Sequence, residues 1–296
     1  MLRLDPALLS RIADLELAAR LIVEGARLGS HRSPYTGTGA EFQQMRPYLP
    51  GDDLKHLDWK HYARTDKLFT RVYRETTEWP VMLAIDTSRS MAFADVHGVT
   101  KLRAATLLAA ALAYVLVTQG DAVGLVAHDE QVRAVLPART GRPHLVRVLG
   151  TLQHIEAAGA TDLAGTVRRA ALRLRRRGFV VLLSDLYDEG WQRALREVRG
   201  MGHEVAVLHV LTPDERMLSP DGDVEFIDLE SDARLVASAE RVKPAYDARL
   251  ARFIDQQRAF AAADGLSYVD ASTDRAPDEI LQSFAQHRLQ LGGRSQ

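Results

Sequence analysis

Three short, strongly apolar runs constrain the fold of this 296-residue chain more than any other feature. The runs occupy residues 81–85, 179–183 and 204–211, and segments with helical periodicity lie between them. Apolar runs of this length are typical of strands that are buried on both faces. Alternating strands and helices predict a mainly parallel sheet with helices on both faces. The fold class expected is therefore α/β and Rossmann-like.

The remaining elements follow from periodicity and from Gly and Pro positions. Helices are predicted over 6–24, 101–118, 144–155, 162–177, 191–201, 242–263 and 277–289. Further strands are predicted over 68–73, 122–127, 131–136 and 266–269, with two short strand-like pieces inside 220–236. We expect three parts: an N-terminal helix with a loop-rich segment packed on the main domain (1–75), an α/β domain (76–290) and a frayed tail (291–296).

Charge and composition exclude several classes of protein. Lys and Arg number 38 against 39 Asp and Glu, and a net charge of −1 gives no overall attraction to nucleic acid or to an anionic membrane. The absence of Cys excludes disulfide scaffolds, thiolate zinc sites and Cys nucleophiles. The longest apolar run, Ala104–Val117, is shorter than the roughly 20 residues of a membrane span. We expect a cytoplasmic protein without membrane insertion or nucleic-acid binding.

Acidic side chains follow two of the apolar runs. Asp86 ends the first run and Asp185 follows the second, and the carboxyl ends of neighbouring parallel strands share one crevice. Ser88 and Ser90 alternate with Asp86, and Thr161 precedes a predicted helix. Oxygen donors of this kind favour Mg²⁺, with Mn²⁺ or Ca²⁺ as alternatives. These five residues are the predicted metal ligands.

Each of these residues also has a purely structural interpretation. Ser88, Ser90 or Thr161 alone is most often the N-cap of a helix, and Asp185 alone is a common turn acid. The combination at the ends of two buried strands favours the cation site over four separate caps and turns.

The sequence Asp86-Thr-Ser88-Arg-Ser90 resembles the DxSxS element of the metal-ion-dependent adhesion site in von Willebrand factor A domains. Thr161 and Asp185 match the threonine and the second aspartate of that site. The resemblance implies a von Willebrand A-like sheet and a metal ion that binds an acidic group of a protein partner.

A longer pattern, in residues 37–64, resembles the signature of the bacterial domain-of-unknown-function family 58. The matching positions are Gly39, Glu41, Phe42, Arg46, Tyr48, Pro50, Gly51, Asp52, Asp53, Asp58, Trp59, Ala63 and Arg64. The resemblance implies a von Willebrand A-like domain after the signature and association with a MoxR-type AAA+ ATPase, or its client, in a chaperone or assembly role. No catalytic activity is established for that family.

The function expected is therefore protein binding without catalysis. One alternative is a Mg²⁺-dependent phosphohydrolase that uses Asp86, although a haloacid-dehalogenase-type enzyme needs a second acid where Ser88 stands. Another alternative is a metal-independent scaffold that binds its partner through residues 37–64. Within that segment, we expect Trp59 to be a core residue.

Overall fold

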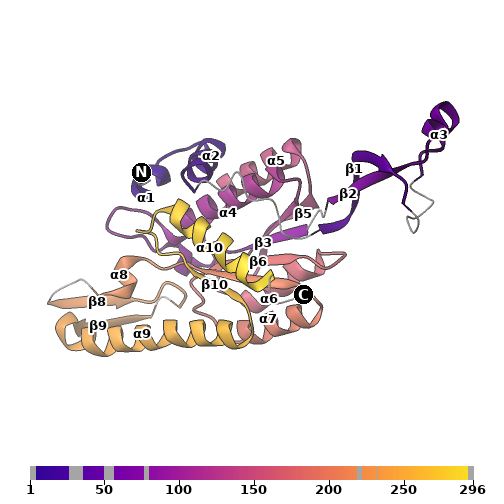
Figure 1. The fold of residues 1–296 in the computed structure, drawn as a ribbon. Helices are drawn as coiled ribbons and strands as arrows, with labels where there is room; N and C mark the ends of the chain where they lie inside the picture. The colour runs from indigo at the N-terminus through magenta and orange to yellow at the C-terminus, as the bar shows by residue number, and fades with distance from the viewer. Residues whose placement is uncertain are drawn as a thin grey trace. The chain divides into compact units, whose positions relative to one another are not determined.

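Two compact units make up the protein, shown in Figure 1. The computed structural model describes residues 5–26, 36–49, 57–76, 80–218, 222–231 and 233–292. Met1–Arg32 and Trp79–Gln296 form one unit, and Ser33–Glu78 forms the other. The N-terminal helices thus group with the α/β unit, whereas the division expected from the sequence placed them with the signature segment.

A six-stranded sheet forms the centre of the α/β unit. Its strands, in spatial order, are β10 (Ser267–Asp270), β7 (Glu204–His209), β6 (Phe179–Ser184), β3 (Pro80–Asp86), β4 (Ala122–His128) and β5 (Val132–Arg139). All neighbours pair in parallel except β5, which pairs antiparallel with β4 at the edge. This arrangement confirms the predicted α/β class with a von Willebrand A-like, Rossmann-like sheet.

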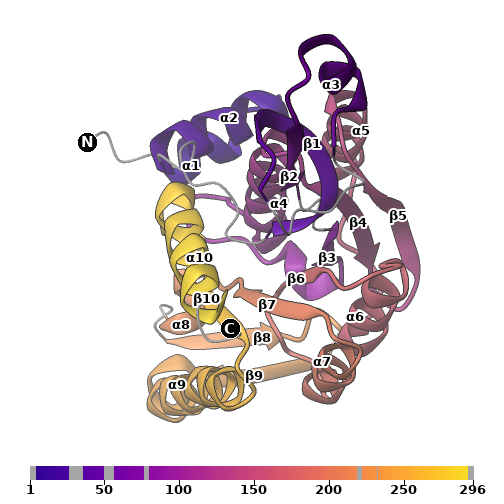
Figure 2. The ribbon, with the colours of Figure 1, turned by 45° about the vertical axis from the view of Figure 1, so that its right-hand side comes forward.

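Helices cover both faces of this sheet, as predicted (Figures 1 and 2). One face packs against α1 (Pro6–Ser10), α2 (Leu15–Ala26), α4 (Lys101–Thr118), α5 (Arg142–Gln153) and α10 (Pro277–Gly292). The other packs against α6 (Leu163–Leu172), α7 (Trp191–Gly200) and the end of α9 (Ala239–Ala263). Alternate residues of β3 point to opposite faces, so Leu83 joins the first core and Ala84 the second. Both faces of β3 are consequently buried.

Helix α4 is the one helix among the described residues that is long and apolar enough to cross a membrane. Of that helix, 67% is buried inside the protein. Its residues Leu107, Leu108 and Leu112 belong to the core against the sheet. The expectation of a buried helix from the apolar run of the sequence is confirmed.

The predicted N-terminal helix is two helices instead of one. Asp14 accepts hydrogen bonds from the backbone N–H of Glu16 and Leu17, at 2.8 and 3.2 Å, so it caps a new start for α2. Arg103 of α4 donates to the carbonyls of Ser10 and Ile12 at the break. A local cap and a distant arginine therefore interrupt a periodicity that the sequence shows as continuous.

The end of α6 differs from the prediction, and the segment around 220–236 agrees with it. Helix α6 ends at Leu172, so the basic residues around 175–177 lie beyond the helix. The irregular segment around 220–236 forms an antiparallel hairpin of β8 (Asp223–Ile227) and β9 (Arg234–Ser238), which confirms the two short strands.

The second unit contains a long strand where no long regular element was predicted. Strand β1 (Thr36–Pro47) pairs antiparallel with β2 (Phe69–Thr76), and α3 (Trp59–Thr65) lies between them in the sequence. Register shifts occur between Thr36 and Gly39 and between Phe42 and Gln44. The first of these irregularities falls at the glycines of β1, which would otherwise weaken a strand.

Candidate functional site

The predicted site lies where β3 and β6 end side by side. The two strands are parallel neighbours, with Ile85 opposite Leu183, so the residues that follow them emerge at the same edge. From β3 the chain passes through α4 to β4, which pairs with one edge of β3. Strand β6, which comes later in the chain, pairs with the opposite edge of β3. Ligands of open α/β sheets bind at such a reversal of strand order. The predicted convergence of the two strand ends is confirmed.

Asp86 is held rigidly at the end of β3. Its Oδ1 accepts a hydrogen bond from the Ser88 N–H at 2.9 Å, and its Oδ2 accepts one from the Ser184 hydroxyl at 2.8 Å. The hydroxyl oxygens of Ser88 and Ser90 are 3.0 Å apart. Burial and the nearby charge of Asp185 raise the pKa of Asp86 to about 7, against the lowering effect of its hydrogen bonds. The fold therefore disfavours the ionised form of this carboxyl group, which lies close to the Ser88 and Ser90 hydroxyl groups.

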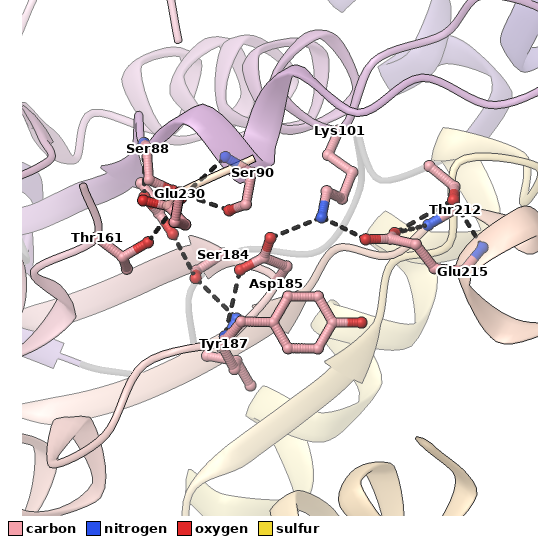
Figure 3. Close-up of polar contacts among 12 residues, drawn as sticks. Ser88, Ser90, Lys101, Thr161, Ser184, Asp185, Tyr187, Thr212, Glu215 and Glu230 are labelled. Atoms are coloured by element: carbon pink, nitrogen blue, oxygen red, sulfur yellow. Dashed lines mark hydrogen bonds and ion pairs between the residues drawn. The ribbon is translucent and has the colours of Figure 1, made fainter. Parts of the chain in front are cut away.

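Thr161 reaches the same place from another loop. Its hydroxyl donates to Oε1 of Glu230 at 3.2 Å, and the Ser90 N–H donates to the same oxygen at 3.0 Å (Figure 3). The cap of α6 is Asp162, which accepts from Gly165 N–H at 2.7 Å, so Thr161 is not needed for that role. Ser88 stands at the N-cap of the short helix η3 (Arg89–Ala92) without making a side-chain cap bond.

Asp185 faces a buried lysine. Lys101 Nζ lies 2.6 Å from Oδ2 of Asp185 and 2.5 Å from Oε1 of Glu215, over the ring of Tyr187 (Figure 3). Burial opposes the charge of Lys101, but the two carboxylates outweigh it and raise the lysine pKa above its ordinary value. Glu215 also forms a capping box with Thr212 at the start of α8 (Pro213–Arg216). One side of the site is thus a buried network of ion pairs.

The donor set fits a hard divalent cation. Ser88 and Ser90 place two hydroxyl oxygens 3.0 Å apart, joined by a hydrogen bond, and both could bind one hard cation. Among the described residues, no group of three or more His, Asp or Glu side chains is arranged to hold a metal. Asp86, Ser88, Ser90, Thr161 and Asp185 supply carboxylates and hydroxyls together.

Four residues of the site were missed by the sequence reasoning: Lys101, Ser184, Glu215 and Glu230. Lys101 offered a weak signal, because it is a charged residue at the first position of a largely apolar helix. The Thr-x-x-Glu pattern of residues 212–215 predicts a capping box, although it gives no hint of the lysine. Glu230 offered no signal, since its contacts are with residues 69 and 140 positions away.

The signature residues belong to the second unit. Gly39, Glu41 and Arg46 lie in β1, Tyr48 is half-buried after it, Arg64 is exposed in α3, and Gly51, Asp52 and Asp53 fall outside the described residues. Asp58 is buried and caps α3 by accepting from the His61 N–H at 2.9 Å. The expectation that Trp59 is a core residue is wrong, because its side chain is 62% exposed.

Comparisons with known proteins place this architecture in a family. The profile of the family described as "Protein of unknown function DUF58" matches residues 44–256. Uncharacterized proteins of Mycobacterium bovis and Mycobacterium tuberculosis are each 32% identical over 231 residues, which span 77% of this chain and 72% of theirs.

Solved structures with a similar fold are more distant in sequence. An aerotolerance-related membrane protein from Bacteroides fragilis is 20% identical, with a TM-score of 0.49 over 70% of this chain and 99% of its own. The conserved hypothetical protein BatB from Bacteroides thetaiotaomicron is 17% identical, with a TM-score of 0.45 over 71% of this chain and 98% of its own. The family match covers residues 44–64 of the signature and the two strands, β3 and β6, that position the site. The chain therefore belongs to the DUF58 family of proteins of unknown function.

Proposed function

We propose that this protein is a binding module without catalytic activity, which uses a divalent cation to capture an acidic group of a protein partner. The observation that supports this most is the convergence of carboxylate and hydroxyl groups from three separate loops at one sheet edge. Asp86, Ser88, Ser90, Thr161 and Asp185 would hold Mg²⁺, with Mn²⁺ or Ca²⁺ as alternatives. The ion would supply a coordination position that a carboxylate from a partner can take.

The surroundings of Asp86 support binding over catalysis. Its side chain is fully buried, and each of its oxygens already accepts a hydrogen bond. A nucleophile must approach its substrate, whereas a ligand has only to be held in place. The phosphohydrolase that would use Asp86 remains the less favoured alternative.

The partner in this proposal is a MoxR-type AAA+ ATPase or its client, acting in chaperone or assembly work. Family resemblance is the ground for this choice. A partner that presents an exposed Asp or Glu would suit an acid-seeking cation.

A second candidate, a metal-independent scaffold, is favoured by one observation. Trp59 is largely exposed and meets Tyr62 edge-on, with ring centroids 6.4 Å apart. Exposed aromatic pairs of this kind are common anchors of protein interfaces. In this alternative, the surface of residues 37–64 binds the partner and the site of Asp86 only stabilises the fold.

A binding experiment separates the two candidates. A purified MoxR-type ATPase from the same organism is captured on the immobilised protein in Mg²⁺ and, separately, in EDTA. We expect capture in Mg²⁺ to fall at least tenfold in EDTA and in Asp86→Ala, because both remove the ion. Asp264→Asn is the control, since this acid pairs with Arg196 on the surface, and it should bind as the wild type does.

The scaffold alternative predicts the opposite pattern. Capture would then survive EDTA and Asp86→Ala but be lost in Trp59→Ala, whose circular dichroism and thermal unfolding must match those of the wild type. Because Trp59 is exposed, this substitution should cost little stability.

A further inference from the structure

Glu230 brings a carboxylate into the site from a distant part of the chain. It lies in the turn between β8 and β9, whereas the residues it contacts follow β3 and precede α6. Its Oε1 accepts from the Ser90 N–H at 3.0 Å and from the Thr161 hydroxyl at 3.2 Å. Figure 3 shows Glu230 with Ser90 and Thr161, on the side of the site away from Lys101. One acid of the protein itself therefore contacts two of the five predicted metal ligands.

The turn that presents Glu230 is fixed by its own hydrogen bonds. Asp228 accepts from the Glu230 N–H at 2.9 Å and from the Ser231 hydroxyl at 2.7 Å, through its two carboxylate oxygens. The Asp228 N–H donates to the Ala233 carbonyl at 2.8 Å. Such Asx-type contacts preorganise a turn. The carboxylate of Glu230 thus reaches the site from a structured tip.

The second carboxylate oxygen of Glu230 is buried within the protein. Its Oε2 is buried and has no hydrogen bond within the described part of the protein. A buried carboxylate oxygen without a donor is costly unless a cation satisfies it. Asp185 and Glu215 pair with Lys101 in another part of the site, and no ion pair among the residues that the structure describes joins that ammonium to Glu230. The buried Oε2 of Glu230 thus favours a cation close to this side chain.

We propose that Glu230 is the built-in acidic ligand of the site. This inference rests on the proposed function, because it assigns to Glu230 the coordination position that an acid of the partner would take. With the hairpin of β8 and β9 in place, the position is filled from within the chain. An acidic group of the partner must then displace Glu230. Glu230 therefore sets how tightly that group has to bind the cation.

The proposal makes two linked predictions about the purified, full-length protein. Glu230→Gln should weaken Mg²⁺ binding roughly tenfold to a hundredfold in calorimetric titration, because it removes a charged ligand. In the wild type, Mg²⁺ should slow amide hydrogen exchange in residues 223–231 and 233–238 at least tenfold, because the ion ties down the tip of the hairpin. In Glu230→Gln, saturating Mg²⁺ should leave this exchange unchanged.

Glu225→Gln is the matched control. It removes the same charge from the same hairpin, where Glu225 pairs with Arg234 at 3.2 Å on the surface. This variant should behave as the wild type does in both measurements, which excludes a general loosening of the hairpin as the cause.

The outcomes distinguish this proposal from the one on which it rests. If the wild type binds Mg²⁺ but Glu230→Gln binds it equally well, or if Mg²⁺ leaves hairpin exchange unchanged in the wild type, Glu230 is not a ligand. The proposed function would survive that result. If the wild type binds no divalent ion at all, the proposed function fails and the assignment of Glu230 fails with it.

Discussion

At the scale of single residues, Asp86 is held in an environment that disfavours its charge. Burial and Asp185 raise its pKa from an ordinary value of 3.8 to about 7. The folded protein therefore keeps a proton on Asp86 at pH values where the unfolded chain has lost it. Because the folded state then binds more protons, the free energy of unfolding falls as pH rises from about 4 to about 7. A bound cation would remove this penalty.

Asp86→Asn tests this directly. In EDTA at pH 8, the variant should be more stable than the wild type by up to about 4 kcal/mol, since the amide carries no charge. At pH 4 the advantage should vanish, because the wild-type carboxyl is then protonated. Urea unfolding at the two pH values measures both differences. Equal stability at pH 8 would mean that Asp86 does not bear an unfavourable charge.

At the scale of elements, Gly124 allows β3, β4 and β5 to pack closely. Gly124 in β4 lies at an irregularity of the pairing with β5. A Cβ there would overlap Met82 Sδ and come within 2.8 Å of backbone atoms of Leu136 and Ala138. The strands would have to move apart to admit one methyl group.

Gly124→Ala should therefore lower the free energy of unfolding by about 1–3 kcal/mol. Gly150→Ala in α5 is the control, because a Cβ there meets no atom within 4 Å, and it should stabilise the helix by about 0.5–1 kcal/mol. Urea midpoints of the two variants should move in opposite directions. An unchanged midpoint for Gly124→Ala would contradict the packing described here.

The strands were predictable from the sequence, and several contacts of the site were not. Runs such as Val81–Ile85 predict buried strands from their apolar composition alone. The positions of the acids that directly follow these runs are then determined by the strands. The contact of Glu230 with Ser90 depends on tertiary packing across 140 residues, which no local pattern encodes. Strand β1 was missed because its glycines, read locally, are breakers, although the pairing with β2 accommodates them at bulges.

At the scale of the whole molecule, charge is balanced overall and concentrated locally. The net charge is −1, yet four carboxylates gather in this site: Asp185 and Glu215 pair with the Lys101 ammonium, Asp86 lies near Asp185, and Glu230 contacts Ser90. A surplus of buried carboxylates is the physical basis for expecting a cation there. Recognition of a partner would then depend on this one place in the α/β unit, and the signature unit would have a separate role.

Calorimetric titration of Mg²⁺ into the purified protein at pH 8 tests the central claim most directly. We predict one saturable site in the wild type and no binding in Asp86→Ala. Asp264→Asn should bind as the wild type does, because that acid is partly exposed at the end of α9, where it pairs with Arg196. Absence of binding in the wild type, or equal binding in Asp86→Ala, would contradict the account.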